Sequence, residues 1–201
     1  MKIKNLHDWN VSYAHARSLQ TQLAEKICFT PVKNKPDIIA GLDCAFTKNG
    51  EIIAAAVVIS TQDYKPIEIV HTVQPVKMPY IPGLLSFREA PACIETVKKL
   101  KNKPDLFMID GQGIAHPRRL GLAAHLGLFF DMPTIGCAKS RLTGSFKNPK
   151  PSKGSYTYLK DNDNQTIGAV LRTRTNVKPL FVSVGNKYTL KDVIYITLSD
   201  S

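Results

Sequence analysis

The sequence predicts a single α/β domain built on a mixed β-sheet with flanking helices. Three strand-like segments follow one another directly in the first third of the chain, which favours antiparallel pairing. Later strand-like segments alternate with helical ones, and crossovers of that kind join parallel strands. With 201 residues, of which 43% are hydrophobic, the chain can form one sizeable core. We therefore expect residues 1–201 to form one domain.

The first half of the chain supplies a helix, three strands and a second helix. Residues 12–26 have helical spacing, and a helix is again expected from Ser86 to Lys101. The TKNG connection between the first two strands contains Asn-Gly, which is a strong hairpin signal. The three strands between these helices are expected at 37–46, 51–60 and 65–73.

The second half alternates strands with helical or irregular segments. The apolar run DLFMID (105–110) predicts a short buried strand that ends at Asp110, and PTIGCA (133–138) predicts another. Between them, HPRRLGLAAHLGLFF has helical spacing, with Pro117 suited to the first helical position. The composition of SFKNPKPSKGSY is typical of a mobile loop. QTIGAVLRT and PLFVSVGN predict two further strands, and TLKDVIYITL predicts a short helix or strand.

The charge and cysteine content narrow the class of protein. Lys and Arg number 27 against 16 Asp and Glu, and this net charge of +11 indicates a polyanionic partner, nucleic acid before an acidic membrane surface. No apolar run approaches the roughly 20 residues that span a bilayer, and no secretory signal is present, so a cytoplasmic protein without membrane association is expected. The four cysteines form no C-x-x-C pair, which favours small buried thiols over a zinc or disulfide framework.

Three acids stand out from their surroundings. Asp43 lies in the middle of an apolar strand, Glu89 lies near the start of a helix, and Asp110 ends a buried strand. In an open α/β sheet, functional groups gather at the carboxyl ends of strands, where these three side chains can converge. Carboxylates that share one site repel each other unless a cation is present, and hard oxygen ligands favour Mg²⁺ or Mn²⁺. The pattern therefore favours a divalent metal site.

Two of the three acids, Glu89 and Asp110, also have a structural alternative, whereas none is as simple for Asp43. Ser86 and Glu89 form an S-x-x-E capping box, while Pro91 could instead mark a helix start near Ala90. Asp110 before a glycine could belong to an ordinary turn. These alternatives stay open from the residues alone.

Basic residues and glycines follow the same strand ends. GQGIAH lacks the third glycine of a dinucleotide-binding loop, so we reject that interpretation. His116 suits phosphate contact at a helix start, and Lys139 is either solvated or a phosphate clamp. His125 lies in an apolar helical pattern, which favours a role in the core.

Three longer strings closely resemble the endonuclease V family of repair nucleases for deaminated adenine: PYIPGLLSFRE, DGQGIAHPRRLGLAAHLGL and PTIGCAKSRLTGSF. The resemblance runs from about Ile39 to Asn186. It implies an RNase H-like fold and a Mg²⁺-dependent endonuclease, with Mn²⁺ as a substitute. The family recognises hypoxanthine and cuts the second phosphodiester on its 3′ side, leaving 3′-hydroxyl and 5′-phosphate ends.

The resemblance also implies roles for individual residues. Asp43, Glu89 and Asp110 match the catalytic, metal-binding acids, and His116 and Lys139 match the basic pair near the scissile bond. The strand-separating wedge matches Pro79, Tyr80, Ile81 and Pro82. The lesion pocket falls on Gly83, Leu85, Gly111, Gly113, Gly121, Ala138 and Leu142. Phosphate contacts are expected from Arg118, Arg119, Ser140 and Arg141.

One departure from the family pattern is visible. Family members continue beyond the VSVGN-like segment into an Arg-Leu-Pro-Glu-Pro-Thr-Arg-like stretch with a further metal ligand, and this sequence has no such stretch. We therefore expect the C-terminal end of the family pattern to be missing, which bears on metal affinity and turnover. The expected partner is DNA containing deoxyinosine or other deaminated or mismatched bases, and a monomer is expected. The alternatives are an inosine-specific ribonuclease and a lesion-binding protein with weak or no catalysis.

Overall fold

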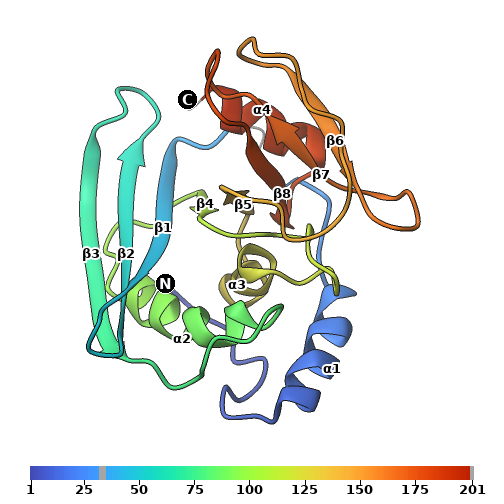
Figure 1. Cartoon of the computed structure of the whole chain (residues 1–201). Coiled ribbons are helices and arrows are strands. Elements are labelled where there is room, and N and C mark those ends of the chain that lie inside the picture. The colour runs from blue at the N-terminus through green and yellow to red at the C-terminus, as the bar shows by residue number, and fades with distance from the viewer. Residues whose placement is uncertain (32–34, 200–201) are drawn as a thin grey trace.

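The structure, a computed structural model, describes residues 1–31 and 35–199 and shows eight strands and four helices in that part of the chain (Figure 1). The strands form one sheet, which confirms the predicted α/β class. In chain order the elements are α1 (Tyr13–Ala24), β1 (Ile38–Phe46), β2 (Glu51–Ser60), β3 (Pro66–Pro75), α2 (Leu85–Lys98), β4 (Leu106–Ile109), α3 (Leu122–Phe130), β5 (Thr134–Ala138), β6 (Tyr156–Lys160), β7 (Thr166–Leu171), β8 (Leu180–Asn186) and α4 (Leu190–Ser199).

The strand order explains why separate parts of the sequence meet at one edge of the sheet. The order is β3-β2-β1-β4-β5-β8-β7-β6. The first three strands pair antiparallel, as predicted, whereas β1, β4 and β5 pair parallel. Strand β8 then pairs antiparallel with β5, and β7 and β6 continue in the same manner. Because β1, β4 and β5 run in the same direction, their carboxyl ends lie at the same edge.

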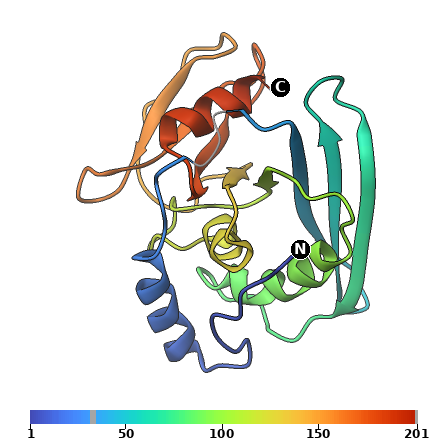
Figure 2. The same cartoon turned by 180° about the vertical axis from the view of Figure 1, so that it is seen from behind.

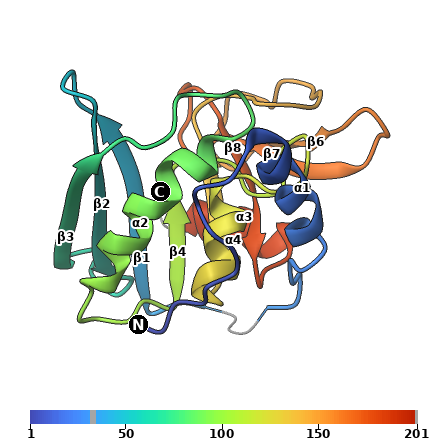
Figure 3. The same ribbon diagram turned by 90° about the horizontal axis from the view of Figure 1, so that it is seen from below.

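Helices cover both faces of the sheet. Helices α2 and α3 pack on one face in a cluster with β1, β2 and β4, and α4 packs on the other face (Figures 2 and 3). The alternation of side chains along β1 produces this division, since Ala40 faces α2 and α3 while Ile39 joins the cluster beneath α4. None of the helices in the described ranges is long and apolar enough to cross a bilayer.

The starts of two helices differ in detail from those predicted. Helix α2 begins at Leu85, within one residue of the predicted start. Its N-cap is Leu84, so the Ser86 capping box is wrong, and Pro91 lies inside the helix instead of marking a start near Ala90. Helix α3 begins at Leu122, and Pro117 lies in the preceding loop instead of the first helical position. The loop folds back on itself because the Gly121 amide donates to the carbonyl of Gly113 (2.9 Å), a contact that local spacing does not reveal. Strand β6 was not predicted, and the C-terminal segment is helical.

A chain of hydrogen bonds explains the buried positions of Ser86 and His125. The His7 Nδ1 lies 2.8 Å from the Asp8 carbonyl, so this nitrogen carries a proton and His7 Nε2 is an acceptor. His125 Nε2 therefore donates to His7 Nε2 (2.8 Å), and His125 Nδ1 accepts from the Ser86 hydroxyl (3.0 Å). Burial holds the pKa of His125 well below its ordinary value, which suits this neutral arrangement. The predicted core role of His125 is confirmed, and Ser86 packs in the core instead of capping a helix.

Candidate active site

Three charged side chains meet at the carboxyl ends of the parallel strands. Asp43 lies on β1, Asp110 directly follows β4, and Lys139 directly follows β5. The Lys139 ammonium forms an ion pair with Asp110 and lies 4.0 Å from Asp43 Oδ2. Its bond to Asp110 and the charges of both carboxylates raise the pKa of Lys139, so it stays cationic at neutral pH. One ammonium thus bridges two carboxylates that come from different strands.

Glu89 is the buried acid of this cluster. It lies inside α2 rather than in its first turn, and only 7% of the residue is exposed. Burial raises its pKa to about 7, and the charges of Asp43 and Asp110 add to the rise, while Arg88 opposes it. Since the effect of a charge requires proximity, all three predicted acids belong to one electrostatic cluster.

The side chain of Asp43 is placed differently from the expectation. The sequence predicted a charge among apolar neighbours on both sides, but 63% of this side chain is exposed. Residues alternate along β1, so Leu42 faces the core while Asp43 faces away. The buried acid, which bears the energetic cost of burying a charge, is therefore Glu89 and not Asp43.

The chemistry of the cluster fits a divalent cation. Three carboxylates supply hard oxygen ligands of the kind that Mg²⁺ and Mn²⁺ prefer. As the side chains stand within the described residues, no three His, Cys, Asp or Glu groups have the geometry to hold a metal ion. The Lys139 ammonium lies where compensating positive charge is required, and the pKa of Glu89 is raised first by burial and further by the charges of Asp43 and Asp110. The donor set and the charge imbalance therefore suit a cation, although the side chains must rearrange to bind one.

His116 contacts the protein rather than solvent. It is buried, and burial together with the nearby Arg118 charge lowers its pKa to about 4, so the ring is neutral at neutral pH. Its Nδ1 accepts from the Arg118 amide (3.1 Å), which leaves Nε2 to donate to the Gly83 carbonyl (3.1 Å). A buried neutral ring at this place positions the Gly83 segment and has no cationic contact to offer a phosphate.

The Gly83 carbonyl is the centre of a larger cluster. Arg118 Nη2 (2.7 Å) and Gln20 Nε2 (3.0 Å) donate to it in addition to His116. Gln20 also donates to the Leu120 carbonyl (3.1 Å) and accepts from Arg118 Nε (2.7 Å). Gly83 itself has φ +78°, which favours glycine. The cluster joins α1 and the loop before α3 to the end of the predicted wedge.

The predicted wedge is a short irregular segment that presents Tyr80 to solvent. Tyr80 is 65% exposed, whereas Ile81 packs against the cluster that contains Leu84 and Phe87. A cavity of about 380 Å³ lies beside it, lined by Pro79, Phe46 and Arg88 among others. The Arg88 guanidinium lies 4.4 Å from the centre of the Phe46 ring. An exposed aromatic ring on an anchored segment is compatible with the predicted role.

Two glycines of the predicted lesion pocket have a packing explanation. A Cβ on Gly113 would overlap the Val184 carbonyl, and a Cβ on Gly121 would overlap the Gln112 carbonyl. Both glycines are buried, so they support the loop before α3. Of the other predicted pocket residues, Gly111 lies in this loop, the Gly83 carbonyl accepts from His116 and Arg118 of the loop, and Ala138 packs in one buried cluster with Ala115. Leu85 begins α2, and Leu142 is exposed.

The predicted phosphate-contacting residues divide into two groups. Arg118 is bound to Gly83 and Gln20, and Arg119 forms an ion pair with Asp161. Ser140 and Arg141 are exposed immediately after Lys139. The second pair is better placed to meet a ligand at the cluster because both residues are exposed next to Lys139, although Arg141 Nη1 also donates to the Gly144 carbonyl (3.1 Å).

Comparisons with known proteins identify the family of the chain. The family model described as Endonuclease V matches residues 21–200. The chain belongs to the endonuclease V family. It is 46% identical over 198 residues to Endonuclease V from Kosmotoga olearia, which covers 98% of this chain and 87% of that protein. Enzymes of this family are nucleases that depend on a divalent metal ion.

Solved structures of the family confirm the fold as RNase H-like. The crystal structure of Endonuclease V from Bacillus subtilis superposes with a TM-score of 0.93 at 33% identity, covering 99% of this chain and 87% of that one. Endonuclease V from Ciona intestinalis, crystallised with a 24mer DNA containing an inosine followed by a ribo-adenosine, has a TM-score of 0.78 at 25% identity, covering 92% and 88%.

Two residues of the site were not predicted from the sequence. Gln20 carried a usable signal, because it is a polar residue between Ala16 and Leu23 on the buried face of α1. Arg88 lines the cavities beside Pro79, and nothing in its local sequence distinguishes it from an ordinary surface arginine.

Proposed function

We propose that the chain is a DNA repair endonuclease that recognises deoxyinosine and cuts the second phosphodiester bond on its 3′ side, leaving 3′-hydroxyl and 5′-phosphate ends. The observation that carries the proposal is the cluster of Asp43, Glu89 and Asp110 with Lys139, in a chain of the endonuclease V family. The complex of the Ciona intestinalis relative with inosine-containing DNA supports the choice of lesion.

Asp43, Glu89 and Asp110 would hold Mg²⁺, with Mn²⁺ as a substitute. A metal ion held there would supply Lewis-acid chemistry for the attacking water and the leaving oxygen. The protein's own part begins with Glu89, which must lose its proton to act as a ligand, and its pKa of about 7 makes that loss sensitive to pH near neutrality. Lys139 keeps its charge throughout and can pair with the phosphate at the scissile bond.

Recognition would use the segment before α2. A lesion base has to leave the stack before it can be read, at a cost of a few kcal/mol, and a side chain inserted between base steps offsets that cost. Tyr80 is exposed for this purpose, and Pro79, Ile81 and Pro82 limit its movement. The extruded base would lie against Gly83 and Leu85 on one side, and the other pocket residues would follow the loop before α3: Gly111, Gly113, Gly121, Ala138 and Leu142.

A second candidate is cleavage of inosine-containing RNA. The DNA bound to the Ciona intestinalis protein carries a ribose directly after the inosine, so that relative accepts a 2′-hydroxyl next to the lesion. Sugar preference depends on how such a hydroxyl fits the protein surface.

One experiment tests both candidates. End-labelled DNA and RNA strands, each with a single inosine, are incubated with and without Mg²⁺ or Mn²⁺, and the ends of the products are mapped. We expect metal-dependent scission of the DNA strand at the second phosphodiester on the 3′ side. Faster scission of the RNA strand would favour the second candidate. Binding without scission would indicate a lesion-binding protein, and equal cutting of strands without inosine would contradict lesion recognition.

A further inference from the structure

The positive charge of the chain is concentrated in one segment. Residues 139–178 contain nine Lys and Arg residues but two acids, whereas the whole chain has 27 and 16. One of these two acids, Asp161, already forms an ion pair with Arg119. The segment leads from β5 through β6 and β7 toward β8, so it forms the edge of the sheet opposite β3 (Figure 1).

A hollow of about 540 Å³ lies within this segment, at strand β6. Its walls combine aromatic rings with lysines, and they consist of Ser145, Phe146, Lys147, Thr157, Tyr158, Lys160 and Asn164. Phe146 is held from below by Phe181, with ring centroids 5.3 Å apart, so one wall of the hollow is fixed by the core.

Strand β6 presents its tyrosines to solvent. Tyr158 is 50% exposed, and its ring lies 5.7 Å from that of Tyr156 in an edge-to-face arrangement. Side chains two residues apart share one face of a strand, so Lys160 continues the row that the two tyrosines begin. Exposed aromatic rings beside lysines are the combination by which proteins bind single-stranded nucleic acid, since the rings stack on bases and the lysines contact phosphates.

The hollow is connected to the candidate active site by a short piece of chain. Ser145 lies six positions after Lys139 and pairs with Lys160 in an isolated β-bridge. Six residues span at most about 20 Å when fully extended, which is less than the roughly 34 Å of one duplex turn. A single nucleic-acid strand can therefore reach both places.

We propose that the β6 hollow is a second nucleic-acid-binding site, in which Tyr158 stacks on an unpaired base and Lys147 and Lys160 contact the adjacent phosphates. The site would hold the strand beyond the lesion, and in this respect it rests on the proposed function. It has no part in the chemistry of cutting, because it lies outside the carboxylate cluster.

The salt dependence of binding tests the lysines. The probe is a fluorescent DNA single strand without inosine, titrated with the full chain at several salt concentrations in the absence of divalent metal. For a single strand, removing one lysine–phosphate interaction lowers the slope of log affinity against log salt by about 0.7. We expect the double variant Lys147→Ala, Lys160→Ala to lower the slope by about 1.4 and to weaken binding.

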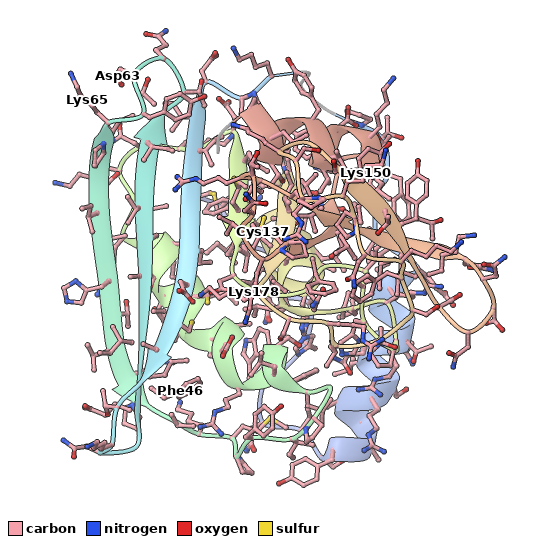
Figure 4. All side chains as sticks on the ribbon, turned by 45° about the horizontal axis from the view of Figure 1, so that its top comes forward. Phe46, Asp63, Lys65, Cys137, Lys150 and Lys178 are labelled. Atoms are coloured by element: carbon pink, nitrogen blue, oxygen red, sulfur yellow. The ribbon has the colours of Figure 1, made fainter. Side chains whose placement is uncertain are left out.

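The matched control is Lys65→Ala, at the tip of the β2–β3 hairpin. Lys65 lies on the other side of the molecule from Lys150, which belongs to the same basic segment as Lys147 and Lys160 (Figure 4). This variant should leave the slope unchanged. An equal decrease of slope in the control, or no decrease in the double variant, would overturn the proposal. The melting temperature of each variant shows whether it is folded.

A Tyr158 variant should change the binding affinity but not its salt dependence, unlike the lysine variants. Stacking carries little charge, so Tyr158→Ala should weaken binding about tenfold without changing the salt slope, and Tyr158→Phe should restore the affinity. With an inosine-containing strand and Mg²⁺, Tyr158→Ala and the double lysine variant should raise KM and leave kcat unchanged. If the wild-type chain cuts that strand and the variants bind normally, the second site is wrong while the proposed function stands. If the wild-type chain does not cut but the variants lose affinity as expected, the second site stands and the proposed function is wrong.

Discussion

At the scale of single residues, the fold raises the pKa of Glu89 and thereby makes the stability of the chain depend on pH. Its carboxyl group is buried beside two other acids, and its pKa rises to about 7. In an unfolded chain a glutamate titrates near 4.3. Between these values the folded chain holds a proton that the unfolded chain has released, so the free energy of unfolding falls as pH rises through this window.

This linkage makes a stability prediction for Glu89→Gln. Glutamine resembles the protonated glutamate and has no charge to bury. The metal-free variant should therefore gain stability over the metal-free wild-type chain as pH rises from about 4.5 to about 8, reaching roughly 3 kcal/mol. Urea unfolding in a chelating buffer at a series of pH values measures the difference.

The control for this prediction lies on the same helix. Glu95 is exposed and forms an ion pair with Lys98 Nζ at 2.6 Å, so Glu95→Gln should change stability little and without this pH profile. A pH-independent difference for Glu89→Gln would show that its carboxyl group is not held at a raised pKa.

The candidate acids could be found from the sequence, but their ionisation could not. Asp43 and Asp110 were identified because a charge interrupts or ends an apolar run. Which acid is buried depends on the direction of each side chain after folding: Asp43 lies in an apolar run but is exposed, and Glu89 is the buried acid. The neutral state of His116 likewise depends on partners that lie far away in sequence.

At the scale of elements, the loop between β4 and α3 is fixed by close contacts between backbone segments. Gly113 lies against the Val184 carbonyl of β8, where no room exists for a side chain. We expect Gly113→Ala to destabilise the chain by several kcal/mol, because rigid backbone has to shift. Thermal unfolding measures this loss. In contrast, Gly154→Ala has open space around its Cβ but φ +85°, so it should cost only about 1 kcal/mol. Similar melting temperatures for the two variants would contradict this account of Gly113.

The segment that carries Tyr80 gives a prediction about substrate type. If Tyr80 fills the gap left by an extruded base, Tyr80→Ala should weaken binding of an inosine-containing duplex more than binding of the same single strand. Fluorescence anisotropy with both substrates makes the comparison. Equal losses would argue against a wedge.

Gln20 should act on recognition through this segment. Gln20→Leu leaves Arg118 Nε without its acceptor and removes a donor from the Gly83 carbonyl, a change expected to cost about 1–3 kcal/mol of stability. It should also weaken duplex binding, but only while Tyr80 is present. A double-mutant cycle with Tyr80→Ala measures the coupling. Gln22→Leu, an exposed position on the same helix, is the control, and additive effects would show that Gln20 has only a general structural role.

Elements with strong periodicity were predictable, and those that depend on tertiary contacts were not. The hairpin of β1 and β2 follows from two apolar runs joined by an Asn-Gly turn. The start of α3 does not, because HPRRLGLAAHLGLFF has helical spacing throughout. Its first part is instead held as a loop, since the Gly121 and Ala123 amides donate to the carbonyls of Gly113 and Gln112. Strand β6 is five residues long and follows an irregular tract, so its pattern is too short to identify alone.

At the scale of the whole molecule, the fold places the proposed recognition segment and the proposed cutting centre beside one another. The sheet brings Asp43, Asp110 and Lys139 to one edge, and α2 carries Glu89 to the same place directly after the segment of Tyr80. The crossover order of the strands produces this convergence. The mixed sheet could be predicted from the order of segments, and the family resemblance supplied the site roles that spacing left open.

The most direct test of the carboxylate cluster as a metal-dependent cutting centre is the Mg²⁺ dependence of scission in the wild-type chain, Asp43→Ala and Asp110→Ala. The substrate is an end-labelled DNA strand with one inosine, and binding is measured in parallel. We expect Mg²⁺-dependent scission by the wild-type chain, and retained binding with scission lowered at least about a thousandfold in both variants, since metal-ligand carboxylates are essential to such chemistry. Wild-type rates of scission in either variant would contradict the central claim.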